Sequence, residues 1–183
     1  MNRLQMENAY AYGFLEETML GPICLCASEK GLRRLDFVDA HELKRLQEIQ
    51  REDSGKAGEG TIANALLQLR EYFQGQQRQF HVAYDLEVFS EFSRRVLKLT
   101  SEIRYGELAT YGQLAAQLGQ PKAARAVGRA LGANPLPIFI PCHRVLGSDG
   151  HLHSYSAPGG LATKSALLRL EGHTIQDERV RFY

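Results

Sequence analysis

The chain has 183 residues, of which 44% are hydrophobic and 23% are charged. This composition is typical of a globular protein with one large core or two small ones, and it excludes a fibre or a disordered chain. The charges nearly cancel, with a net charge of +1. No apolar run approaches the roughly 18 residues that cross a bilayer, and the start lacks the apolar core of a signal peptide. We therefore expect no membrane contact and a cytoplasmic location.

The two parts of the chain differ in charge. Residues 1–85 carry ten basic and 13 acidic side chains, whereas residues 86–183 carry 12 basic and eight acidic ones. Between Leu108 and Ser148 there is no Asp or Glu, but this stretch holds Lys122, Arg125, Arg129 and Arg144. Such a positive field suits a polyanion, although a solvated basic face would give the same pattern.

The first part of the chain predicts a small α+β domain. Short apolar or alternating runs separated by turn residues predict an antiparallel meander with strands at 10–15, 23–27 and 32–38. Asp39 is expected to cap a helix whose apolar positions are Leu43, Leu46 and Ile49.

A polar, glycine-rich loop at residues 51–60 follows that helix. Thr61 is expected to cap a second helix that stops at Gly75, and residues 80–84 favour one more strand. We assign residues 1–85 to this supporting domain.

Residues 86–183 are predicted to be mostly helical. The expected helices span 90–101, 111–118, 122–131 and 161–170. The second and third of these have the spacing of a helix-turn-helix, and Pro121 suits the first turn of the third. That helix, PKAARAVGRALG, is built mainly of Ala and Gly between cations. It favours minor-groove or backbone docking over base reading in the major groove, unless its alanines serve only helix packing.

Cys142 is placed to act as a nucleophile. It is followed directly by His143 and Arg144, and a neighbouring base or positive charge is what produces a thiolate near neutral pH. In an extended segment adjacent side chains point to opposite faces, so a water is expected to carry the proton between Cys142 and His143. The alternative is a buried structural cysteine.

These residues together resemble a known family. The stretch RAVGRALGANPLPIFIPCHRVLGSDG, with YGELATYGQLA before it and YSAPGGLATKSALLRLEG after it, is similar to the O6-alkylguanine-DNA alkyltransferases. The resemblance is close over about residues 89–171. The N-terminal part matches loosely, through the GPICLCASEKGLRRLDF hairpin. It implies a ribonuclease-H-like N-terminal domain, followed at residues 86–183 by a winged-helix-like, DNA-binding and cysteine-acceptor domain, an α+β protein overall.

The resemblance implies DNA repair by direct reversal. An alkyl group on guanine O6, or on thymine O4, is transferred irreversibly to Cys142, so that each molecule acts once. His143 matches the residue that takes the thiol proton through water, and Glu171 the carboxylate that orients it. Asn134 matches the amide that bonds near the thiol and braces the turn.

The resemblance also implies a duplex partner that carries the lesion and is bound through the minor groove by a monomer, with the damaged base turned out of the stack. Arg125 matches the residue that fills the vacated space. The residues implied in DNA binding are Arg125, Ala123, Ala124, Ala126, Gly128, Arg129 and Lys122. Those implied in substrate binding are Tyr111, Tyr155, Ser156, Lys164 and Val145.

Some positions depart from the family pattern. His153 and Ser154 stand where relatives have glycines, and Ala157 and Pro158 are extra residues that we expect to alter the pocket. Cys24 and Cys26 are too close in sequence for a zinc site, so we expect no metal or cofactor. Two other functions stay open: a non-catalytic alkylguanine sensor that recruits other repair proteins, and a Cys-His hydrolase.

Overall fold

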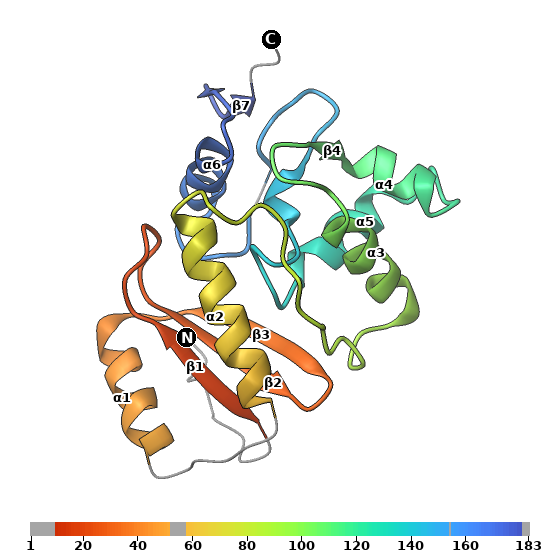
Figure 1. Ribbon diagram of the computed structural model, residues 1–183. Helices are drawn as coiled ribbons and strands as arrows, with labels where there is room; N and C mark the ends of the chain where they lie inside the picture. The colour runs from red at the N-terminus through yellow and green to blue at the C-terminus, as the bar shows by residue number, and fades with distance from the viewer. Residues whose placement is uncertain (1–9, 52–57, 154, 181–183) are drawn as a thin grey trace. The chain divides into compact units, whose positions relative to one another are not determined.

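The structure is a computed structural model that describes residues 10–51, 58–153 and 155–180 (Figure 1). The chain divides into two compact units, Met1–Asp85 and Leu86–Tyr183. Residues 52–57 of the predicted glycine-rich loop lie outside the described residues, and so does Ser154. None of the described helices is long and apolar enough to cross a membrane.

The first unit is a three-stranded antiparallel sheet between two helices (Figure 1). Its strands are β1 (Ala11–Leu15), β2 (Ile23–Ser28) and β3 (Gly31–Phe37), in the order β1-β2-β3, which confirms the meander. Central strand β2 is buried at every position because α1 (Ala40–Arg51) and α2 (Glu59–Phe73) pack on opposite faces.

Alternation along the strands separates the two faces of this sheet. Tyr12 packs in one cluster with Leu43 of α1. The next residue, Gly13, lies on the other face, where a Cβ atom would stand 2.3 Å from Cγ2 of Ile62 in α2. Only glycine lets α2 approach this closely.

The helix starts of this unit agree with the sequence in part. Asp39 caps α1, since its Oδ1 accepts a hydrogen bond from the Glu42 N–H at 2.8 Å. Of the three apolar positions named for that helix, Leu43 and Leu46 are buried, whereas Ile49 is 42% exposed. The second helix begins at Glu59 after Gly58 in a left-handed conformation, so the prediction that Thr61 caps it is wrong.

The strand predicted at residues 80–84 is absent from the described structure of this unit. The segment forms a single parallel bridge, from Tyr84 to Leu32. The backbone of His81 is hydrogen-bonded to a side chain of α2 and not to a strand. Gln68 accepts from the His81 N–H at 2.7 Å and donates to the His81 carbonyl at 3.2 Å. A short apolar run is therefore not sufficient to make a strand here.

The second unit begins with three helices. These are α3 (Glu91–Ser101), α4 (Tyr111–Gln117) and α5 (Ala124–Gly132). A capping box starts α4, in which Thr110 accepts from the Gln113 N–H and the Gln113 side chain accepts from the Thr110 N–H. Gly119, with φ of +75°, makes the turn to α5. That helix starts later than predicted, so Pro121 lies in the turn and not in the first helical turn.

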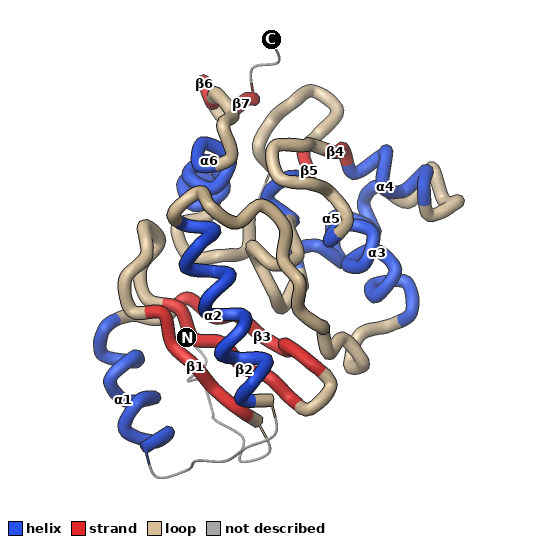
Figure 2. The backbone as a smooth tube through the Cα atoms, viewed as in Figure 1, coloured by secondary structure: helices blue, strands red, loops and turns tan. Residues whose placement is uncertain are grey.

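The segment between α5 and α6 is mostly irregular (Figure 2). It contains the short 3-10 helix η1 (Cys142–Arg144) and strand β5 (Val145–Leu146), which pairs in parallel with β4 (Ala109–Thr110). Helix α6 (Leu161–Leu170) has the predicted bounds, and the hairpin of β6 (Ile175–Gln176) and β7 (Arg179–Val180) follows it.

Candidate active site

The pairing of β4 with β5 assembles this site. Ala109 lies opposite Val145, and Thr110 lies opposite Leu146. Because α4 starts directly after β4 and η1 ends directly before β5, this short ladder brings Tyr111 and Cys142 to one place. Because Tyr111 and Cys142 are more than 30 residues apart in sequence, hydrophobic periodicity could not predict that they meet.

Asn134 holds the chain that leads to the thiol. Its Oδ1 accepts from the Leu136 N–H at 3.0 Å, and its Nδ2 donates to the Ile140 carbonyl at 2.8 Å and to Cys142 Sγ at 3.1 Å. Between these contacts Ile138 is fully buried and has φ of +76°, an unusual conformation for a β-branched residue. One amide thus fixes a strained turn and contacts the sulfur.

The Cys142 thiol is buried, with 6% of the residue exposed. Burial raises its pKa above the ordinary value, and the Asn134 hydrogen bond and the positive charge of Lys164 act in the opposite direction. At neutral pH the resting group is therefore the thiol, and a nearby base is needed to form the nucleophilic thiolate.

A base stands beside it, in a buried ionic cluster. His143 Nε2 lies 2.9 Å from Glu171 Oε1. Arg144 holds the same carboxylate with two hydrogen bonds of 2.8 Å, from Nε to Oε2 and from an Nη to Oε1, and also donates to the Ile103 carbonyl at 2.6 Å. Burial alone would raise the pKa of Glu171, but His143 and Arg144 outweigh it and hold the pKa well below its ordinary value.

This cluster decides which imidazole nitrogen is free. Since Glu171 is an ionised carboxylate, it can only accept, and His143 Nε2 must carry the hydrogen. Burial also lowers the pKa of His143, so the ring is neutral at neutral pH. Its other nitrogen, Nδ1, has no hydrogen-bond partner among the described residues. His143 is therefore poised to accept one proton at Nδ1.

Lys164 is almost fully buried, and its charge acts on the Cys142 thiol. Its Nζ donates to the Val145 carbonyl at 2.7 Å. Burial lowers its pKa from 10.5 to about 8, and the Cys142 sulfur opposes that shift. Lys164 therefore acts on the thiol through its charge and is held by the Val145 carbonyl, and neither residue lines the cavity described below.

Replacing Lys164 by methionine is expected to remove a pH-dependent gain in stability. The unfolded chain keeps this proton up to about pH 10.4, whereas the folded chain releases it at about pH 8. Because the unfolded state binds more protons in this window, the free energy of unfolding rises with pH there, by at most about 1.4 kcal/mol per pH unit. Urea unfolding at about pH 8 and about pH 10 should show the rise in the wild type only. Parallel changes in both proteins would contradict this assignment.

A cavity of about 590 Å³ opens beside the thiol. The helix-turn-helix contributes Tyr111, Ala124, Arg125, Gly128 and Arg129 to its lining. The later segments contribute Cys142, Tyr155 and Ser156. Burial and then the negative charge of a Cys142 thiolate raise the pKa of Tyr155 well above its ordinary value, so its hydroxyl keeps its proton and can donate.

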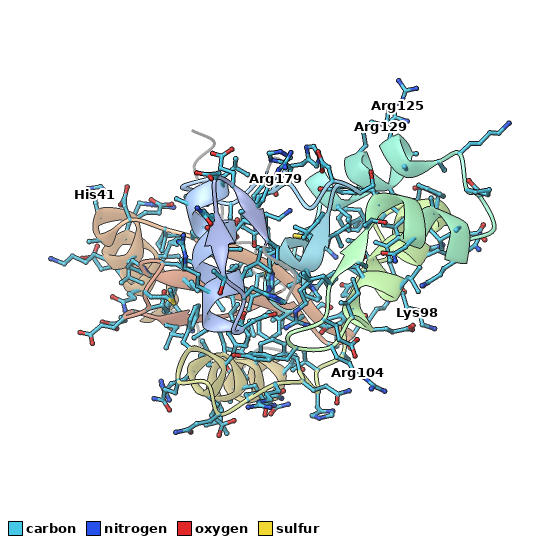
Figure 3. The ribbon with its side chains drawn as sticks, turned by 90° about the horizontal axis from the view of Figure 1, so that it is seen from above. His41, Lys98, Arg104, Arg125, Arg129 and Arg179 are labelled. Carbon is cyan, nitrogen blue, oxygen red and sulfur yellow. The ribbon has the colours of Figure 1, made fainter. Side chains whose placement is uncertain are left out.

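The rim of this cavity carries positive charge. Arg125 and Arg129 lie one turn apart on α5, are exposed, and extend outward together (Figure 3). Lys98 and Arg104 lie at the opposite edge of this unit in the same view. Ala124 and Gly128 line the cavity beside these cations. Ala123, which precedes α5, and Ala126 are partly exposed but do not line it.

Two family models match the two parts of this chain. The family model described as "6-O-methylguanine DNA methyltransferase, ribonuclease-like domain" matches residues 10–86. The model described as "6-O-methylguanine DNA methyltransferase, DNA binding domain" matches residues 91–173. The chain belongs to the 6-O-methylguanine DNA methyltransferase family. The family and the α+β fold class predicted from the sequence are confirmed.

Individual relatives in this family match most of the chain. The methylated-DNA–protein-cysteine methyltransferase of Methanosarcina acetivorans is 40% identical over 161 residues, which cover 88% of this chain and 98% of the relative. That of Mycobacterium leprae is 39% identical over 160 residues, covering 87% and 91%. The crystal structure of Mycobacterium tuberculosis OGT in complex with DNA superposes with a TM-score of 0.71 at 36% identity, covering 87% of this chain and 91% of that one.

The structure brings the predicted amide to the acceptor and the predicted carboxylate to the base, as two hydrogen-bonded pairs. It changes part of the argument for them. The segment that holds Cys142 and His143 is helical, not extended, so the argument from opposite strand faces is wrong. Sequence reasoning also missed Arg144 as the second partner of Glu171. Its signal was a positively charged residue directly after the Cys142–His143 pair. Lys122 is exposed on the turn before α5 and does not line the cavity.

Proposed function

We propose that this protein repairs O6-alkylguanine, and also O4-alkylthymine, in duplex DNA by moving the alkyl group to its own Cys142. The observation that carries the proposal is a thiol at the wall of a cavity large enough to admit a base, next in sequence to the buried His143–Glu171 pair. Residues 86–183 hold all of these groups, and residues 1–85 support them. Membership in the methyltransferase family supports the reaction class.

The first step is removal of the thiol proton. A water between Cys142 and His143 carries it to Nδ1, and the Glu171 carboxylate stabilises the imidazolium that forms. The thiolate pair of electrons then forms a bond to the alkyl carbon, and the carbon–O6 bond breaks with its electrons going to the base. The product thioether has no low-energy route back to the thiol, so the protein is consumed.

The leaving base needs its developing negative charge neutralised. The Tyr155 hydroxyl stays protonated and lines the cavity with the thiol, so it can donate to the base as the carbon–O6 bond breaks. Ser156, which lines the same cavity, offers a second hydroxyl. Lys164, which does not line the cavity, favours the Cys142 thiolate through its positive charge.

DNA binding is assigned to α5 and its rim cations. Arg129 and Lys122 contact phosphates, the small residues of α5 let its backbone approach the minor groove, and Arg125 fills the space left by the extruded base. Tyr111, at the start of α4, lies beside that base. All the reacting groups come from one chain, so the protein acts as a monomer, and an acceptor that must stay a free thiol fits the reducing cytoplasm.

Arg125→Ala is expected to slow repair of duplex DNA roughly tenfold or more while changing the reaction with free O6-methylguanine little. Its side chain compensates for base extrusion, which costs a few kcal/mol in a duplex and nothing for the free base. Single-turnover rates on both substrates measure the ratio. Lys98→Ala, an exposed cation on α3, is the matched control. Equal losses on the duplex and the free base would argue against this role of Arg125.

The reaction itself is tested by counting transfers. Protein mixed with an excess of duplex that contains O6-methylguanine should demethylate one lesion per molecule and then stop. An alkylguanine sensor would bind the duplex and remove no methyl group. A Cys-His hydrolase would release many products per molecule. Either outcome overturns the proposed function.

A further inference from the structure

His153 occupies a position that the mechanism above does not use. It lines the cavity together with Cys142, Tyr111 and Tyr155. Its ring centroid lies 6.2 Å from that of Tyr111, with the two planes inclined by 59°. Glycine was expected at this place in the loop, so the imidazole is an addition that this chain makes to the wall.

The loop fixes the backbone next to this residue. Leu152, directly before it, is buried in a cluster with Leu168 and Val180, and its N–H donates to the Glu178 carbonyl at 2.8 Å. The Val180 N–H donates in turn to the Gly150 carbonyl at 3.2 Å. The C-terminal hairpin thus anchors the backbone from which His153 enters the cavity wall.

Gly147 leaves space for the imidazole ring of His153. A Cβ atom on Gly147 would stand 2.3 Å from His153 Nε2, so the absent side chain leaves room for the imidazole edge. Asp149 Oδ1 lies 3.8 Å from the same nitrogen. One edge of the ring is therefore supported by the loop, while 54% of the side chain stays exposed.

We propose that His153 is a substrate-contacting residue that stacks on the extruded base, with Tyr111 on the other side. This inference rests on the proposed function. A base between two parallel rings needs about 6.8 Å, which is twice a stacking distance of about 3.4 Å. The observed 6.2 Å is close to this, and the half-exposed imidazole can rotate to make the rings parallel. Aromatic stacking is a general way to hold an unstacked base.

Single-turnover rates of three variants test the proposal. His153→Ala should lose on the order of tenfold in rate at subsaturating substrate, on free O6-methylguanine and on the duplex alike. His153→Phe, which keeps the ring but not its polar edge, should restore most of the rate. His151→Ala, in the same loop but outside the cavity lining, should match the wild type.

The outcomes separate this inference from the proposed function. A His153→Ala rate within about twofold of the wild type, or a failure of phenylalanine to restore the rate, would overturn the stacking role. A loss confined to the duplex would also overturn it, because it would place the contact on the DNA backbone. If the wild-type protein transfers nothing, it is the proposed function that fails.

Discussion

Cys142→Ala is expected to abolish alkyl transfer and to leave duplex binding unchanged. The thiol is the only proposed acceptor, whereas the groups assigned to DNA lie on α5 and at the cavity rim. The fold should survive, because the Asn134 amide keeps its 2.8 Å hydrogen bond to the Ile140 carbonyl when the sulfur is gone. Transfer of labelled methyl from duplex to protein, and duplex affinity by fluorescence anisotropy, measure the two properties separately.

Two further cysteines supply the control for that variant. Cys24 and Cys26 are buried in the sheet of the first unit, and burial raises the pKa of both thiols. Cys24→Ala should therefore transfer at the wild-type rate. Residual labelling of Cys142→Ala would show that another residue accepts the alkyl group, and lost duplex binding would show that the sulfur also serves the DNA interface.

Glu171→Gln is expected to destabilise the fold by about 3–5 kcal/mol, because it leaves a buried Arg144 without its counter-charge. In the molecules of the variant that still fold, transfer should slow about a hundredfold or more. The glutamine amide can donate to the imidazole, which favours the tautomer with its hydrogen on Nδ1 and removes the free proton acceptor. Urea unfolding and single-turnover transfer measure the two losses.

The dependence of folding stability on acid pH tests whether the charge of Glu171, and not only its shape, stabilises the fold. Because the folded pKa lies below the unfolded value of about 4.3, its ion pairs stabilise the fold above that pH and are lost as pH falls below it. The wild type should lose this stability in acid, and Glu171→Gln should not. Glu102→Gln, an exposed carboxylate at the end of α3, is the matched control. A stable, active Glu171→Gln protein would contradict the account of the cluster.

Local pattern predicted those parts of the fold that local interactions determine. The three strands of the first sheet follow from apolar alternation and turn residues, and α6 has the bounds predicted for the last helix, after the glycine-bearing segment. The acceptor motif was recognisable because its residues lie close together in sequence. Where a side chain from a distant element intervened, as Gln68 does at His81, the local prediction failed.

The rest of the site depends on contacts that no local pattern encodes. The two-residue ladder of β4 and β5 is too short to be read from sequence, yet it places Tyr111 beside the thiol. The double hydrogen bond from Arg144 to Glu171 joins residues 27 positions apart. Spacing could suggest that these residues belong together, but only the folded chain shows which atoms meet.

Peptide mapping by mass spectrometry, after reaction with a duplex that contains O6-methylguanine, tests the central claim most directly. We expect one methyl group per molecule, attached to the sulfur of Cys142, with Cys24 and Cys26 unmodified. A protein that stays unmethylated while lesions disappear, or that carries the methyl group on another residue, would contradict it.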